Sequence, residues 1–261
     1  GIRDKLGTGV QTCALPISLG DQILALSGVN HARVDSVGAA FRVAGMAVDT
    51  ARNRTYVWAN LCQITIVTTA PFCSNTGEAQ LTAVNAGTLT QFIDTAPRVI
   101  GGAGGVAYNR VTSRIYVAVQ FGTVDSVKVV DAATLDVVAT IAVGSGASGV
   151  AVNPVTNRIY VANQNDGTVS VIDGALNAVI TTVFVGYNAY PQGIGVDPVR
   201  NVVYVSETND YSLIVLDGAA NVVIGSTYLG GTSTDAQPNP ATGRVYVPMN
   251  GLGQVRILRA Q

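Results

Sequence analysis

The feature that most constrains this chain is a phrase that recurs five times. Each copy leads from small residues through a turn rich in Asn, Asp and Pro to an apolar strand that contains a tyrosine. The anchoring tyrosines are Tyr56, Tyr116, Tyr160, Tyr204 and Tyr246. Their spacings are 60, 44, 44 and 42 residues, close to the period of about 40 to 45 residues that is typical of four-stranded propeller blades. The sequence therefore predicts an all-β fold, a β-propeller of four-stranded blades.

The clearest copy predicts all four strands of one blade. Alternating β-branched and aromatic residues place strands at 149–152, 158–162, 168–172 and 178–185. Asn-Pro, Asn-Asp-Gly and Asp-Gly sequences mark the turns between them. The second strand is apolar on both faces, which is expected when a sheet is covered by a neighbouring blade on each side.

The residues of this copy also carry a family resemblance. The segments GVAVNP, RIYVAN and TVSVID, all within residues 149–173, resemble the repeat of the YVTN-type β-propeller family. The resemblance covers nearly all of residues 22–260. It implies a disc of blades around a central channel, a secreted or cell-surface location, and in many members no known catalysis. A fold resemblance does not fix the function.

The first seventeen residues do not resemble the rest of the chain. Residues 8–17, TGVQTCALPI, and residues 1–4 match the translation of a sequencing-library adapter, with Gly7 departing from it at one base. We interpret residues 1–17 as an adapter-derived, non-native segment and residues 18–261 as a partial propeller domain.

Strand counting suggests that the propeller is truncated at its N-terminal side. Residues 22–26 and 32–37 align with the third and fourth strands of a blade, whereas residues 255–258 form a third strand with no fourth. We therefore expect that about five to six blades are represented here and that the intact protein has six or seven. On this interpretation the native start and any signal peptide lie upstream, and we expect a secreted, periplasmic or cell-surface protein.

Composition and charge exclude two classes of partner. The net charge is −1 and charged residues make up 12% of the chain, without a Lys/Arg cluster that would follow a phosphate backbone, so nucleic acid is not an expected partner. No apolar run approaches the roughly 20 residues needed to span a bilayer as a helix.

Cys62 and Cys73 lie in an insertion that accounts for the long first spacing of the repeat. A disulfide between them is one interpretation and suits an exported protein; two unpaired thiols in a cytosolic protein is the other. His31 is the only histidine and is expected in a hairpin turn. The sequence therefore predicts no His-containing catalytic triad and no zinc site.

Candidate ligand-binding residues lie in loops expected at the channel mouth. Aromatic and amide side chains on such loops suit sugars or peptides, although Asn, Asp and Gly are also ordinary turn residues. The candidates are Tyr187, Asn188, Tyr190, Asp166, Glu207, Asp210, Tyr211 and Asp235. These acidic loops are also weak candidates for calcium, because they lack the regular carboxylate spacing of an EF-hand loop. No other cofactor is expected.

Three functions remain open from the sequence. The first is a non-catalytic binding or scaffold module for a protein or glycan. The second is a propeller enzyme of the lactonase or lyase type with a metal in the channel, although Gly105, Gly149 and Gly193 stand where its inner-strand ligands are expected. The third is a propeller segment of a larger cell-wall or redox protein. The first is the function that we favour.

Overall fold

The computed structural model is described at residues 12–13, 22–27, 33–38, 41–49, 51–52, 54–67, 70–85, 92–95, 99–121, 125–250 and 252–259. Every regular element within these residues is a β-strand. No helix in this part of the chain is long and apolar enough to cross a bilayer. The chain divides into two compact units, residues 1–103 and 104–261, and each is described by itself. His31 lies outside the described residues.

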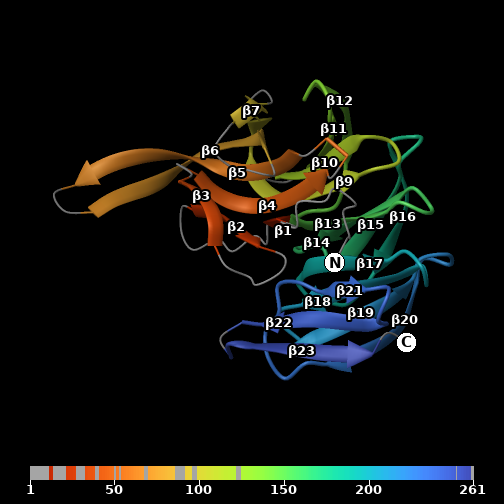
Figure 1. The fold of residues 1–261 in the computed structure, drawn as a ribbon. Helices are drawn as coiled ribbons and strands as arrows, with labels where there is room; N and C mark the ends of the chain where they lie inside the picture. The colour runs from red at the N-terminus through yellow and green to blue at the C-terminus, as the bar shows by residue number, and fades with distance from the viewer. Residues whose placement is uncertain are drawn as a thin grey trace. The chain divides into compact units, whose positions relative to one another are not determined.

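The first unit contains two antiparallel sheets (Figure 1). The smaller is formed by β1 (Thr12–Cys13), β2 (Gln22–Ser27) and β3 (Arg33–Gly38). The larger is formed by β4 (Phe41–Asp49), β5 (Arg54–Val67), β6 (Ala70–Asn85), β7 (Phe92–Thr95) and β8 (Val99–Ile100). Most of residues 1–17 lie outside the described residues, so their adapter origin stays a prediction.

The insertion that contains Cys62 and Cys73 lengthens a hairpin. β5 and β6 continue their antiparallel pairing to Val67 and Ala70, well beyond β4. In this register Cys62 stands opposite Asn75 and Cys73 stands opposite Ile64. The two cysteines are therefore diagonal neighbours across the ladder, and the disulfide stays a prediction.

The second unit contains successive antiparallel sheets in chain order. The first has β9 (Gly102–Asn109), β10 (Arg114–Gln120), β11 (Ser126–Asp131) and β12 (Val137–Ala142). The second has β13 (Ala147–Asn153), β14 (Arg158–Asn163), β15 (Thr168–Asp173) and β16 (Ala178–Phe184). The third has β17 (Pro191–Asp197), β18 (Val202–Glu207), β19 (Ser212–Asp217) and β20 (Val222–Tyr228). The fourth has β21 (Gln237–Asn239), β22 (Arg244–Met249) and β23 (Gln254–Arg259).

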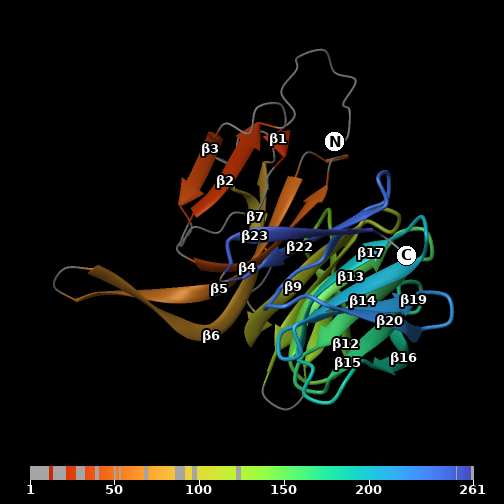
Figure 2. The ribbon, with the colours of Figure 1, turned by 90° about the horizontal axis from the view of Figure 1, so that it is seen from below.

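These sheets are the blades of a β-propeller, as the repeat predicted. All four strands expected from the clearest copy are present within two residues of their predicted bounds. Neighbouring blades face each other, and Figure 2 shows strands of successive sheets, such as β13 and β17, lying beside one another.

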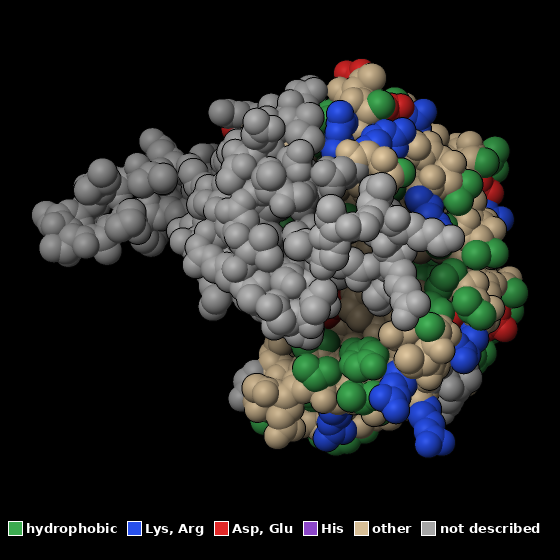
Figure 3. All heavy atoms as spheres, viewed as in Figure 1, with side chains coloured by type: hydrophobic (Ala, Val, Ile, Leu, Met, Phe, Trp, Pro, Cys, Tyr) green, Lys and Arg blue, Asp and Glu red, His purple; other side chains and the backbone are tan. Residues whose placement is uncertain are grey.

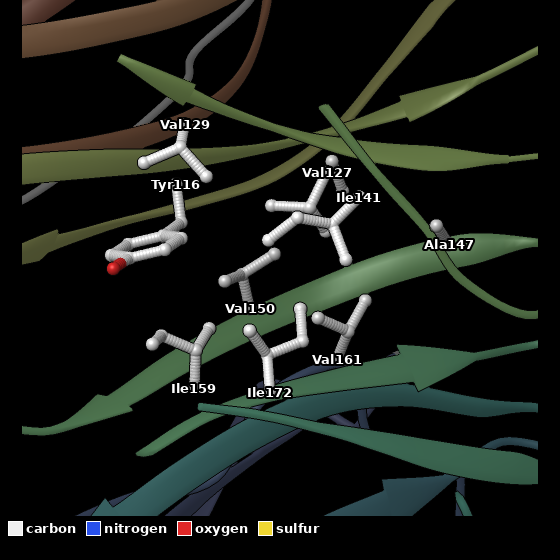
Figure 4. Packing of buried hydrophobic residues seen from close by; sticks show 10 residues of the cluster. Tyr116, Val127, Val129, Ile141, Ala147, Val150, Ile159, Val161 and Ile172 are labelled. Atoms are coloured by element: carbon white, nitrogen blue, oxygen red, sulfur yellow. The ribbon is translucent and has the colours of Figure 1, made fainter. Parts of the chain in front are cut away.

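The core of this unit consists of apolar layers between consecutive blades. Figure 4 shows the layer between the first two blades, where Tyr116, Val127 and Val129 meet Val150, Ile159 and Ile172. Tyr160 and Tyr204 occupy the same position in the next two layers. The repeated tyrosine is thus buried against the following blade, which explains why it anchors the sequence period.

The inner strands approach one another so closely that only glycine fits. A Cβ atom on Gly105 would lie 2.7 Å from the carbonyl oxygen of Ser148, and one on Gly149 would lie 2.5 Å from that of Gln192. A Cβ on Gly193 would collide with the backbone of Asp235. These glycines are required by the packing of adjacent blades.

Candidate functional site

The blades of the second unit have two ends with different connections. We call one end the loop face; it consists of the loops that enter each first strand and the hairpins between second and third strands. Its segments are residues 121, 125, 143–146, 164–167, 185–190, 208–211, 229–236, 250 and 252–253. We call the other end the turn face. Its segments are residues 110–113, 132–136, 154–157, 174–177, 198–201, 218–221 and 240–243.

Backbone hydrogen bonds join the segments of the loop face from blade to blade. The amide of Val185 donates to Gly167 of its own blade at 2.9 Å, and the amide of Thr208 in the next blade donates to Tyr190 at 3.3 Å. The preceding loop repeats the pattern, because Gln164 donates to Gly146 at 2.9 Å. The loop face is therefore a connected surface on which side chains of different blades are held in place.

Two predicted site residues use their carboxylates to hold these loops. Oδ2 of Asp166 accepts a hydrogen bond from the amide of Ser145 at 2.7 Å. Oδ1 of Asp235 accepts from the amide of Ala236 at 2.8 Å and from Nε2 of Gln237 at 3.0 Å. Each has a structural role in addition to any contact with a ligand.

Glu207, the last residue of β18, is a buried carboxyl group with an incomplete set of partners. It is 2% exposed, and its Oε2 accepts a hydrogen bond from the Ser212 hydroxyl at 2.6 Å. Its Oε1 has no hydrogen-bond partner and lies 3.7 Å from the position that a Cβ on Gly186 would occupy. Burial raises the pKa of Glu207, and the nearby Asp210 carboxylate adds to this.

The fold does not require an acid at this position. The corresponding residues of other blades are Ala59, Val119, Asn163 and Met249, and all are buried. Glu207 is therefore a departure from the repeat that points toward the loop of residues 185–190. Perturbed buried carboxyls of this kind are concentrated at functional sites.

The remaining predicted residues are exposed on two adjacent segments of the loop face. Tyr187 is 89% exposed, and Asn188 and Tyr190 follow in the same loop with positive φ angles of 54° and 50°. Asp210 and Tyr211 lie in the next hairpin, where Tyr211 also has a positive φ of 51°. Left-handed backbone is unusual for tyrosine and indicates that the surrounding contacts determine the loop conformation.

The structure adds three aromatic residues that the sequence analysis missed. Phe121, Phe184 and Tyr228 are 60%, 50% and 68% exposed, and all lie at the loop-face end of their blades. The rings of Phe184 and Tyr187 pack edge to face with centroids 4.8 Å apart. In the sequence these residues are marked only by their position, because each aromatic lies at or just beyond the end of a strand rich in β-branched residues.

The turn face is built from repeated side-chain caps. At the start of each turn between a first and a second strand, an Asn or Asp oxygen accepts the backbone amide two residues later. Asn153 accepts from Val155 at 3.0 Å and also from Thr156, three residues later, at 3.3 Å. Nδ2 of Asn153 then donates to Oδ1 of Asn201 in the next blade at 2.7 Å. The same bond joins Asn109 to Asn157.

Where the capping residue is Asp, it lacks the side-chain amide donor that Asn supplies, and an arginine three residues later forms an ion pair with it. Asp197 pairs with Arg200 at 2.8 Å, and Arg200 also donates to the Pro240 carbonyl of the next blade at 3.5 Å. In the first unit Asp49 pairs with Arg52 at 2.9 Å. Asn-containing copies have threonine at the arginine position, so the two residues vary together.

A second row of aspartates on the turn face is held as carboxylates. Backbone amides, first that of Ala133, and the Arg114 guanidinium lower the pKa of Asp131. The hydrogen bond from Arg158, followed by backbone amides, lowers the pKa of Asp173. Two backbone amides do the same for Asp217. These acids are structural.

Charge and metal-ligand chemistry are limited over the described surface. Figure 3 shows basic, acidic and hydrophobic side chains intermixed on the side that it presents. Within the described ranges, no three His, Cys, Asp or Glu side chains form a group that could hold a metal ion. The calcium hypothesis gains no support from the loop-face acids that the structure describes.

Comparison with known proteins supports the fold. No protein-family model matches the chain, and no curated protein matches its sequence. Among solved structures, it is similar to a chain in the crystal structure of the mitotic checkpoint complex, with a TM-score of 0.69 and 12% identity over 92% of this chain and 68% of that one. It is also similar to Kuenenia stuttgartiensis hydrazine synthase, with a TM-score of 0.59 and 12% identity over 92% and 90% of the two chains.

Proposed function

We propose that this propeller is a non-catalytic binding module that contacts a protein or glycan through its loop face. The observation that carries the proposal is the distribution of aromatic side chains in residues 104–261. Every described aromatic residue of this unit that is more than a third exposed lies at the loop face: Phe121, Phe184, Tyr187, Tyr190, Tyr211 and Tyr228. Exposed hydrophobic residues of the turn face are aliphatic, such as Val155 and Val199.

Exposed aromatic rings on rigidly held loops are a common means of recognition. They offer large contact areas with little loss of side-chain entropy on binding, and Tyr adds a polar group for orientation. The loop-face segments are joined by backbone hydrogen bonds, so little ordering is needed when a partner binds. The YVTN-type resemblance supports the same proposal and, with it, a secreted or cell-surface location.

The test is a binding screen with matched variants. The protein is screened against a glycan array and a displayed peptide library, and each hit is measured again with Tyr187→Ala and with Val199→Ala as the control. Loss of binding in the first variant and retention in the second supports the proposal. Hits that depend equally on both residues, or a screen with no hit, contradict it.

Export is tested at the gene. Sequencing of the source DNA upstream of position 18 should show a signal peptide and further repeat strands. A genomic sequence continuous with residues 1–17 would contradict their adapter origin, and an upstream region without an export signal would contradict the proposed location.

Glu207 favours a second candidate, a carboxylate-dependent enzyme of the lactonase or lyase type. A buried, partly unpartnered carboxyl whose pKa is raised by burial, beside an exposed loop, is a candidate for general acid catalysis. Turnover of a lactone panel by the wild type and its loss in Glu207→Gln would favour this candidate over the binding module.

A further inference from the structure

The loop face carries acidic side chains that no basic residue of its own segments neutralises. The acids of these segments are Asp125, Asp166, Asp210 and Asp235, and Glu207 precedes one of the segments as the last residue of β18. Its segments contain no Lys, Arg or His. The base that approaches it is Arg256 of β23, whose Nη2 lies 3.3 Å from the position of a Cβ on Gly230. The loop face is therefore acidic.

The turn face carries a similar number of acids, but arginines accompany them. Asp131, Asp173 and Asp197 each form an ion pair with an arginine. Arginine also stands at positions 110 and 244 of this end. Because the two ends are built by the same repeat, the missing bases of the loop face are a local property and not a consequence of overall composition.

The loop-face acids differ in how many hydrogen bonds and ion pairs their carboxyl groups form within the protein. Asp125 is 2% exposed and accepts three backbone amides, from Phe121, Gly146 and Ala147 at 2.6 to 2.8 Å, so it is a structural anchor. Asp210 is exposed and forms no ion pair within the described residues. Oε1 of the buried Glu207 points toward the same surface with no hydrogen-bond partner.

Aromatic residues share these segments of the chain. Tyr211 directly follows Asp210, and Tyr187 and Tyr190 lie in the loop whose Gly186 approaches Oε1 of Glu207. Ring faces attract Lys and Arg cations, more strongly when Arg stacks on the ring. The exposed Asp210 carboxylate and the aromatic side chains together therefore favour a cationic ligand over a neutral sugar, which would use the rings and gain nothing from the carboxylate.

We propose that the loop face binds a cationic segment of a partner protein, with Arg or Lys side chains placed at Asp210 and on the rings of Tyr187 and Tyr211. This inference rests on the proposed binding function and narrows it to a polypeptide. Electrostatic complementarity of this kind mainly sets specificity and the rate of association, and it weakens with added salt.

Calorimetric titration of the full chain tests the inference with a capped peptide of alternating Arg and Ser as the probe. The same peptide with Glu in place of Arg, and a neutral chitin oligosaccharide, serve as comparison ligands. Asp210→Asn should weaken binding of the Arg peptide about two- to five-fold, and Tyr187→Ala by a similar factor. Asp136→Asn is the matched control, because it removes one exposed carboxylate from the turn face and should change binding less than two-fold.

Each result has a defined meaning. Binding of the Arg peptide that weakens with salt and with Asp210→Asn, but not with Asp136→Asn, supports the inference. Equal weakening by both Asn variants, or no heat from the Arg peptide, overturns it. Binding of the oligosaccharide alone, lost in Tyr187→Ala, also overturns the cationic partner but leaves the proposed binding function in place.

Discussion

The turn face and the loop face belong to the same blades, yet they follow the repeat to different degrees. On the turn face the capping side chain occurs at Asn109, Asn153, Asp197 and Asn239, and each accepts from the amide two residues later. Asp49 caps the corresponding turn of the first unit in the same way. On the loop face one structural position holds Val119, Asn163, Glu207 or Met249. Repetition at one end stabilises the blades, which leaves the other end free to vary and to carry function.

The largest effect is expected from removing a cap that also joins two blades. Asn153→Ala leaves two turn amides without their acceptor and Asn201 without its donor, which should cost about 2 to 3 kcal/mol of unfolding free energy. Asn239→Ala is the matched control, because Asn239 caps its own turn, and should cost about 1 kcal/mol. Thermal unfolding measures both; equal losses would contradict a separate contribution from the bond between blades.

The paired variation of Asp and Arg can be transferred to another blade. Asn153→Asp keeps the turn acceptor but loses the donor to Asn201, and should cost about 1 to 2 kcal/mol. Adding Thr156→Arg reproduces the arrangement of Asp197 and Arg200 and should recover part of that loss. Denaturant unfolding of the two single variants and the double variant gives the coupling energy. A coupling energy near zero would show that the arginine does not make up for the lost hydrogen bond to Asn201.

Glu207 sharpens the comparison because it is a loop-face residue whose ionisation costs stability. Its pKa is raised in the folded state, so its favourable contribution is complete below the unfolded value of 4.5 and is lost as pH rises through the folded pKa. Glu207→Met, which copies the residue of the fourth blade, should therefore stabilise the protein by about 1 kcal/mol at pH 7. The gain should disappear below about pH 4. Unfolding curves at both pH values measure this, and a gain independent of pH would indicate packing instead.

Asp173 should show the opposite pH dependence at the turn face. Its pKa is lowered, so its contribution is present above the unfolded value of 3.8 and is lost as pH falls below it. Asp173→Asn should cost less than about 1 kcal/mol at pH 7, because the pair with Arg158 is screened by solvent. High salt should reduce the difference between the two proteins. A loss that persists at acid pH would mean that the carboxylate charge is not its source.

Tyr187 should have the smallest effect on stability. Its side chain is 89% exposed, and Tyr187→Ala removes little beyond the edge-to-face contact with Phe184, which should change the unfolding free energy by less than about 0.5 kcal/mol. Loss of binding without loss of stability would separate the loop face from the repeat scaffold. A clear drop in unfolding temperature would instead give Tyr187 a structural role.

Much of the fold could be predicted from local patterns. The tyrosine period, the alternation of β-branched residues and the Asn-Pro and Asn-Asp-Gly turns determined the strands of the repeat, because each blade uses the same short-range chemistry. The positions of the candidate loops were also predicted, since the loop that contains Tyr187 and the hairpin that contains Tyr211 follow directly from strand order. Phe121, Phe184 and Tyr228 were missed because residues at strand ends give no signal that distinguishes burial from exposure.

The sequence by itself determined the repeat, the blades and the end of each blade at which variable loops lie. Only the tertiary structure decided which carboxylates find hydrogen-bond or ion-pair partners within the protein. Asp125, Asp166 and Asp210 are the same residue type in similar loops, yet the first accepts three amides, the second accepts one and the third forms no ion pair within the described residues. The partners of Asp125 and Asp166 in other segments lie 21 or 22 residues away in the chain, and short-range patterns contain no information about contacts at that separation.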